Sequence, residues 1–290
     1  MINYQGERLL SREREALKEL EEIIGKKIFS EKTFEEILTS SNSSQDLEEK
    51  LGPSPLTFSA LDGHVITLSL DSCGFDSVPD QIALFPEIEE LYLSENSITI
   101  LPELFKKLVK LKVLNLTGNK IKVLPDFISQ LSNLKSLHLS ENNLGSLPDS
   151  MEKMSALVNL TLDSNSFSNG EIPSVVFQLK HLEVLYVSNM NIKSIPEEIG
   201  NLTSLRKLRL DFNRISSIPS TIGELVNLEF FLLNDNLLTA LPESLRKLKK
   251  IREMHLENNP KLTISREIDE WIDSLDESAK IWIEVEKIPR

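Results

Sequence analysis

A repeating block of 23 residues constrains the fold of this chain more than any other feature of its sequence. The first apolar residue of each block recurs at this interval, except for one interval of 25 residues between Leu157 and Leu182. The nine positions are Val65, Ile88, Leu111, Leu134, Leu157, Leu182, Leu205, Leu228 and Ile251. A constant period of this length predicts a solenoid, in which each unit buries its apolar side against its neighbours.

Each block opens with a short strand that leads into a turn. In the strand near Leu205, Leu208 and Leu210 are two residues apart and point inward, while Lys207 and Arg209 point outward. Three residues after the last leucine, seven of the nine blocks carry an asparagine. These are Asn96, Asn119, Asn142, Asn165, Asn213, Asn236 and Asn259. We expect their amides to point inward and to satisfy backbone groups of the turn that would otherwise be buried without partners.

The second part of each block predicts a short helical segment. An apolar residue precedes a proline in eight blocks, and proline suits the first position of a helical turn because its missing N–H costs nothing there. An acidic residue follows the proline in six of them, where the helix dipole favours negative charge. Apolar residues three and six places after the proline, such as Ile199 and Leu202, then pack against the strands.

These residues carry a family resemblance. The pattern Leu-x-x-Leu-x-Leu-x-x-Asn-x-Ile/Leu, followed by Ile/Leu-Pro-x-x-Ile-x-x-Leu, resembles the leucine-rich repeat, and specifically its intracellular Ras-group class with 23-residue units. The match runs roughly from Val65 to Leu262. The resemblance implies an α/β fold: a right-handed, horseshoe-shaped solenoid of nine repeats, with a parallel concave sheet and helical or 3-10 segments on the convex side.

We divide the chain into residues 1–64, a helical cap with a hairpin, residues 65–263, the repeat domain, and residues 264–290, a second cap. Residues 6–24 have the spacing of an amphipathic helix that Gly25 ends, and a shorter helix is expected over 33–38 with Phe34, Ile37 and Leu38 inward. Asp62-Gly63 predicts a hairpin over 56–68 that closes the sheet edge. We expect the helices to cover the end of the core, and the alternative is a dimerisation or docking helix.

After the last repeat, the pattern predicts a helix and a final strand. The apolar face of the helix consists of Ile264, Ile268, Trp271, Ile272 and Leu275, and the strand alternates through Ile281, Ile283 and Val285. We expect Trp271 to pack on the last repeat.

Three positions depart from the repeat. Cys73 replaces the first asparagine, and we expect a buried, unreactive thiol there. Residues 168–170 enlarge the turn of the fifth repeat, and Met190 replaces the asparagine of the sixth. Together these two departures predict a local change in curvature, with Asn189 or Asn191 partly replacing the missing amide; the alternative is a neutral insertion.

Composition narrows the range of partners. With 32 basic and 45 acidic residues the net charge is −13, which disfavours nucleic acid and anionic membranes. A single cysteine excludes disulfide-bonded caps, and the charged residues 1–28 do not resemble a secretory signal. We therefore expect a cytoplasmic protein that does not bind membranes.

The outward column of the strands predicts the binding surface. It consists of Ser69, Tyr92, Asn115, His138, Thr161, Tyr186, Arg209, Leu232 and His255. Nine strands about 4.8 Å apart would give a face roughly 40 Å long, which suits a protein or a long peptide. We predict that Tyr186, Arg209, Phe212, Phe230 and Leu232 form a protein-binding patch, because exposed aromatic and arginine side chains dominate binding energy.

The alternative to a binding patch is that some of these residues, especially Phe212, turn inward or pack on each other. Tyr92 and His138 are candidates for a second contact zone, which lies among Glu89, Glu90, Glu95 and Glu141.

Catalysis finds little support in the sequence, and we expect no cofactor and no metal. His138 and His255 share the column but would lie about 24 Å apart. A grouping of Ser136, His138 and Asp163 would lie on a shallow, wet face that excludes water poorly, so we regard it as chance.

We therefore predict a non-catalytic, monomeric scaffold or adaptor that binds a protein partner on its concave face. The Ras-group resemblance implies signalling partners such as small GTPases or phosphatase assemblies, although it carries over no partner-specific residue. The alternatives are a recognition subunit of a ubiquitin ligase or kinase complex, and a self-associating structural solenoid.

Overall fold

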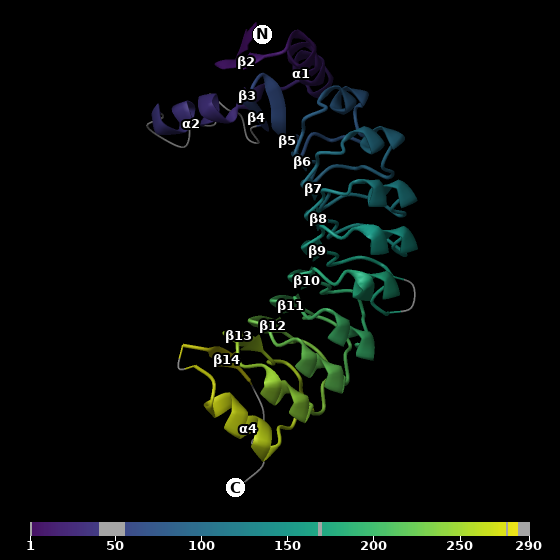
Figure 1. The fold of residues 1–290 in the computed structure, drawn as a ribbon, viewed down its shortest axis with the longest axis vertical. Coiled ribbons are helices and arrows are strands. Elements are labelled where there is room, and N and C mark those ends of the chain that lie inside the picture. The colour runs from purple at the N-terminus through teal and green to yellow at the C-terminus, as the bar shows by residue number, and fades with distance from the viewer. Residues whose placement is uncertain (1, 41–55, 168–169, 277, 284–290) are drawn as a thin grey trace. The chain divides into compact units, whose positions relative to one another are not determined.

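The computed structural model describes residues 2–40, 56–167, 170–276 and 278–283. It contains two compact units, Met1–Leu137 and His138–Arg290, and we describe each by itself. In each unit the strands of the repeats lie on one side and short helices on the other (Figure 1). The predicted boundaries after residues 64 and 263 stay predictions.

The first unit begins with seven elements that precede or open the repeats. These are β1 (Ile2–Tyr4), β2 (Glu7–Leu9), α1 (Ser11–Ile24), β3 (Ile28–Ser30), α2 (Glu31–Ser40), β4 (Leu56–Leu61) and β5 (His64–Ser69). The predicted helix over 6–24 is wrong at its start, because Leu9 belongs to β2 and pairs with Ile2 of β1. Gly25 ends α1 in the left-handed conformation, as predicted.

Helix α1 is fixed to the first repeat by a buried carboxylate. Glu13 is 2% exposed; its Oε2 accepts a hydrogen bond from the backbone N–H of Val65 at 2.6 Å, and its Oε1 lies 2.7 Å from His64 Nδ1. Leu17 and Leu20 on the same helix are fully buried. The helix thus covers apolar surface beside β5. The side chains of Phe34, Ile37 and Leu38 lie outside the described residues.

The predicted hairpin is confirmed, but it does not close the sheet. Strands β4 and β5 pair in an antiparallel manner, with Leu61 opposite His64 across the Asp62-Gly63 turn. Strand β3 then pairs in parallel with β4, so β3 and not β4 is the edge strand. The sequence gives little sign of β3, because it is only three residues long.

Each repeat contributes one short strand whose central residue points into the core. In the first unit, the parallel strands after β5 are β6 (Glu90–Tyr92) and β7 (Val113–Asn115). Strand β8 (Ser136–His138) includes the boundary between the units. The second unit continues with β9 (Asn159–Thr161), β10 (Val184–Tyr186), β11 (Lys207–Arg209), β12 (Phe230–Leu232) and β13 (Glu253–His255). Leu185, Leu208 and Phe231 are at most 1% exposed, which confirms the predicted inward column.

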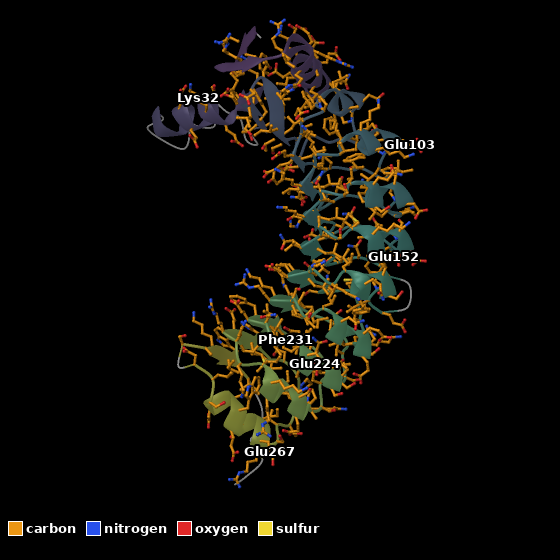
Figure 2. All side chains as sticks on the ribbon, viewed as in Figure 1. Lys32, Glu103, Glu152, Glu224, Phe231 and Glu267 are labelled. Carbon is orange, nitrogen blue, oxygen red and sulfur yellow. The ribbon has the colours of Figure 1, made fainter. Side chains whose placement is uncertain are left out.

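The helical segments are five-residue 3-10 helices. They are η1 (Asp80–Leu84), η2 (Glu103–Lys107), η3 (Asp126–Gln130), η4 (Asp149–Lys153), η5 (Ser174–Gln178), η6 (Glu197–Asn201), η7 (Ser220–Glu224) and η8 (Glu243–Lys247). The proline precedes the first helical residue instead of occupying it: the carbonyl of Pro196 accepts the first intrahelical bond from Ile199 at 3.1 Å. Glu103, Glu152 and Glu224 project from these segments (Figure 2).

The predicted asparagine ladder is confirmed. Asn213 is 8% exposed; its Oδ1 accepts from the N–H groups of Met190 and Ile192 at 3.1 and 3.0 Å. Its Nδ2 donates to the carbonyls of Val187 and Leu210, both at 2.9 Å. One side chain thus satisfies buried backbone groups of two consecutive repeats.

The ladder changes at Met190, whose apolar side chain is 2% exposed at the place of an amide. Asn189 is exposed, and its Nδ2 reaches Ser164 Oγ at 3.0 Å. Asn191 is exposed as well, so neither residue replaces the missing amide, and that prediction is wrong. Ser168 and Asn169 of the enlarged turn lie outside the described residues, and the change in curvature stays a prediction.

The second unit ends as predicted, with helix α4 (Arg266–Asp273) and strand β14 (Lys280–Trp282), which pairs in parallel with β13. Ser265 caps α4 by accepting from the N–H of Ile268. Trp271 is 3% exposed, so it packs in the core as expected. Val285 lies outside the described residues.

Candidate functional site

The sheet of the second unit brings four of the five predicted patch residues together. Parallel pairing places Tyr186 beside Arg209 and Arg209 beside Leu232, while Phe230 lies beside Lys207. Tyr186, Arg209, Phe230 and Leu232, with Lys207 and Glu253, line a shallow depression of about 190 Å³. We call this surface the sheet patch. Its outward direction follows from the alternation along β10, β11 and β12.

Two cations lie against the aromatic rings of the sheet patch. The Arg209 guanidinium carbon is 5.9 Å from the centre of the Tyr186 ring, and Lys207 Nζ is 5.1 Å from that of Phe230. Both distances are within the range of a cation–π contact. These contacts restrict the rings before any partner binds, which lowers the entropy lost on binding.

Arg209 is also held from beneath by a buried carboxylate. Asp211 is 2% exposed, and its two oxygens accept from Arg209 Nε and Nη2 at 2.9 and 3.2 Å. This bidentate pairing raises the pKa of Arg209, which is charged in any case. Arg209 is therefore a fixed part of the fold as well as of the patch, and its replacement by an acid would leave Asp211 buried beside a like charge.

Phe212, the fifth predicted residue, is not part of the depression. It follows β11 in the turn and is 55% exposed, so the alternative that it turns inward is wrong. Its backbone N–H donates to the carbonyl of Asn234 in the next repeat at 3.2 Å. Phe212 therefore lies where the chain leaves the sheet, beyond Asp211.

One further aromatic residue, Trp282, lies on this face and is not predicted by the 23-residue period. Trp282 of β14 pairs with His255 of β13, and the two rings stack 4.2 Å apart at 19°. His255 Nε2 lies 2.9 Å from Glu253 Oε1, and its Nδ1 lies 3.2 Å from Glu257 Oε1. Trp282 remains 38% exposed. The outward alternation of Lys280 and Trp282 was the available signal, but this strand falls outside the 23-residue period.

A row of ion pairs borders the sheet patch at the starts of the strands. Arg206 reaches Glu229 at 2.7 Å and Glu183 at 3.8 Å, and Arg252 reaches Glu229 at 3.4 Å. The nearby guanidinium of Arg206 lowers the pKa of Glu229. The charges of this row therefore neutralise one another. Lys207, beside the depression, has no ion pair among the described residues, and its ammonium group lies over the Phe230 ring.

The predicted second zone takes one residue from each unit, and we describe each residue by itself. In the first unit, Tyr92 donates to Glu90 Oε2 at 3.0 Å, and burial together with this bond raises its pKa to about 12. In the second unit, His138 Nδ1 lies 3.3 Å from Thr161 Oγ1, and burial lowers its pKa. His138 is thus uncharged at neutral pH. Neither residue has the exposure of Phe212 or Trp282.

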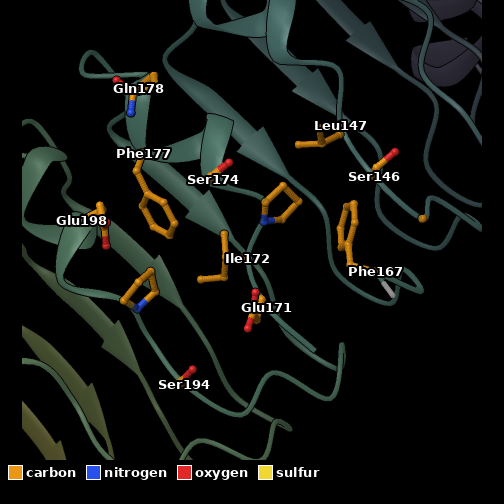
Figure 3. A pocket seen from close by; sticks show the side chains of 13 residues that line it. Ser146, Leu147, Phe167, Glu171, Ile172, Ser174, Phe177, Gln178, Ser194 and Glu198 are labelled. Atoms are coloured by element: carbon orange, nitrogen blue, oxygen red, sulfur yellow. The ribbon is translucent and has the colours of Figure 1, made fainter. Parts of the chain in front are cut away.

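A larger hollow of about 580 Å³ lies beside the enlarged turn of the fifth repeat (Figure 3). Ile172 lies there between the rings of Phe167 and Phe177, and Glu171 and Glu198 lie at its rim. The three apolar side chains are each at most 7% exposed. They are therefore already packed and present little apolar surface to a ligand.

Of the grouping Ser136, His138 and Asp163, the last two contact different residues. The carboxylate of Asp163 accepts from the Ser188 N–H at 2.7 Å and from Ser140 Oγ at 3.3 Å, whereas His138 contacts Thr161. Cys73 is half-buried and not buried as predicted, but desolvation still raises the pKa of its thiol to about 11, which fits the predicted unreactive role. Among the described residues, no group of three or more histidines, cysteines and acids has the geometry of a metal site.

Comparison with known proteins places this geometry in context. A protein-family model for the leucine-rich repeat region matches residues 68–187 and 168–275 of this chain. A solved leucine-rich repeat protein of Leptospira interrogans is 29% identical with a TM-score of 0.66, and the match covers 82% of this chain and 62% of that one. The chain therefore spans less than two thirds of the Leptospira protein. The sequence has no match among curated proteins.

Two further structures are similar. Internalin C2 of Listeria monocytogenes is 26% identical with a TM-score of 0.59, and the match covers 77% of this chain and 90% of internalin. The Arabidopsis receptor kinase HAESA, solved with the peptide hormone IDA and the co-receptor SERK1, is 29% identical with a TM-score of 0.60. That match covers 71% of this chain and 40% of HAESA. In the described part of this chain, no helix has both the length and the apolar character required to cross a membrane.

Proposed function

The chain belongs to the leucine-rich repeat family, and we infer that it is a non-catalytic adaptor that binds a protein partner through the sheet patch. Proteins of this family generally act in protein–protein interaction. The observation that carries the proposal is the depression lined by Tyr186, Arg209, Phe230 and Leu232. Aromatic and arginine side chains around an apolar hollow are the residue types that dominate binding energy in protein interfaces.

The proposal includes finer statements that the sequence predicts. We propose the intracellular Ras-group class, a cytoplasmic location, a monomer, and a signalling partner such as a small GTPase on the face predicted to be concave. HAESA, which was solved with a peptide hormone and a co-receptor, supports a protein or peptide ligand. The alternatives are recognition within a ubiquitin ligase or kinase complex and self-association, and the identity of the captured protein distinguishes them.

We predict that the double variant Phe230→Glu, Leu232→Ser loses the partner that the wild-type chain retains. A charge in the apolar depression removes buried contact area and must be desolvated on binding, so we expect affinity to fall by about 30-fold or more. The measurement is affinity capture followed by titration with the captured, purified protein. Arg209 stays unchanged in this variant because Asp211 depends on it.

The matched control is Val226→Glu, which places the same charge on a 48% exposed side chain before β12. This variant should capture the partner as the wild type does. Equal capture by all three proteins, with unchanged melting temperatures, would exclude the sheet patch as the binding site.

A further inference from the structure

A strained aromatic residue stands out beside the sheet patch. Phe212 has a φ of +53°, in the left-handed region. A bulky side chain is unfavourable there, because its Cβ lies too close to the following carbonyl oxygen. The turn itself demands this conformation, since the equivalent residue of every repeat shares it. Those residues are Ser72, Glu95, Gly118, Glu141, Ser164, Asn189, Asp235 and Asn258.

The eight equivalents are small, polar or acidic residues or glycine, and only Phe212 is aromatic. Asparagine and aspartate tolerate the left-handed region because their short polar side chains can bond locally. Asparagine would therefore fit the backbone at position 212 better than phenylalanine does. Phe212 is 55% exposed, so its ring gives up much of the burial that a core phenylalanine would offer against the strain.

The surroundings of the ring are polar. In the next repeat, the Asp235 carboxylate accepts from Asn234 Nδ2 at 2.8 Å and from Asn258 Nδ2 at 2.9 Å. In the preceding repeat, Asn189 is exposed at the equivalent position. The phenyl ring thus lies next to polar residues at the equivalent turn positions of the adjacent repeats, and Phe212 directly follows Asp211, which binds Arg209 of the sheet patch.

We propose that Phe212 is a binding residue whose ring inserts into an apolar pocket of the partner. This inference rests on the proposed function and extends it: the partner contacts the sheet patch and also reaches past the ends of the strands. Strained residues persist where function requires them, and an aromatic ring that is more than half exposed would bury its remaining surface in a pocket on the other molecule. The partner is therefore a folded protein with a pocket for an aromatic side chain.

Two readouts of opposite sign test the inference. Phe212→Asn should raise the melting temperature by about 2 °C, because it relieves the backbone, and should weaken binding of the captured partner by about tenfold. Phe212→Ala has no polar side chain to bond locally in the left-handed region, so it should weaken binding to the same extent without that rise. A residue with a purely structural role would not become more stable on losing its ring.

Leu237→Ala is the control for loss of an exposed apolar side chain, because Leu237 is 51% exposed at a position without a positive φ. It should change neither readout. Binding of Phe212→Asn within twofold of wild type, or a melting temperature that does not rise, would overturn the inference. If Phe230→Glu, Leu232→Ser loses the partner while Phe212→Asn keeps it, the proposed function stands without this contact. If neither variant loses the partner, the proposed function fails as well.

Discussion

Replacing Asn213 by alanine should reduce the free energy of unfolding by about 4 kcal/mol, one of the two largest effects expected in this protein. The amide Oδ1 of Asn213 accepts hydrogen bonds from two buried N–H groups, those of Met190 and Ile192. Alanine has no side-chain acceptor for either of them. Each N–H left unsatisfied in the interior costs about 1–3 kcal/mol, and the donor to Val187 is lost in addition. The measurement is urea unfolding followed by circular dichroism.

The control for Asn213 is Asn201→Ala, since Asn201 is exposed on η6. That variant should stay within about 0.5 kcal/mol of the wild type. A loss of less than about 1 kcal/mol for Asn213→Ala would show that water or a shifted backbone replaces the amide.

Phe231→Ala should destabilise the protein by about 4 kcal/mol, because a fully buried aromatic side chain leaves a cavity that the surrounding core cannot fill. Phe231 is 0% exposed at the centre of β12, between Phe230 and Leu232 (Figure 2). Thermal unfolding of the purified variant measures the effect. Because Phe231 points away from the sheet patch, the fraction that remains folded should bind the partner with wild-type affinity.

Leu232→Ala is the matched comparison on the same strand. Leu232 is half-buried and lines the depression, so its truncation should weaken binding more than stability. If Phe231→Ala weakened binding in the folded fraction while Leu232→Ala did not, the assignment of inward and outward faces on β12 would be wrong.

The repeat core was predictable because every repeat must bury the same apolar positions and satisfy the same backbone groups in its turn. Leu208 and Leu210 must be buried, and the turn after them needs an amide to satisfy its backbone, so the residue types recur in register. The sheet patch was predictable in part for the same reason: strand alternation alone places Tyr186, Arg209 and Leu232 side by side. Both the repeat core and the sheet patch follow from the residue pattern within each repeat and from the pairing of adjacent repeats.

The missed features depend on contacts outside the period. The β1–β2 hairpin and β3 are three-residue strands with no repeat to mark them, and the apolar Leu9 fits a helix as well as a strand. The stack of Trp282 on His255 forms only because β14 joins the sheet after α4. The residue type of Phe212 suits an apolar patch, so the sequence placed it there. Only the structure shows that Phe212 lies outside the depression and that its backbone is strained.

Photocrosslinking from the sheet patch tests the central claim most directly. A benzophenone amino acid at position 230 places the reactive group in the depression, and the same group at position 226 places it on an exposed side chain before the strand. The account predicts a covalent adduct with the captured partner from position 230 and none from position 226. An adduct from position 226 alone would contradict the claim that the partner binds the outward face of these strands.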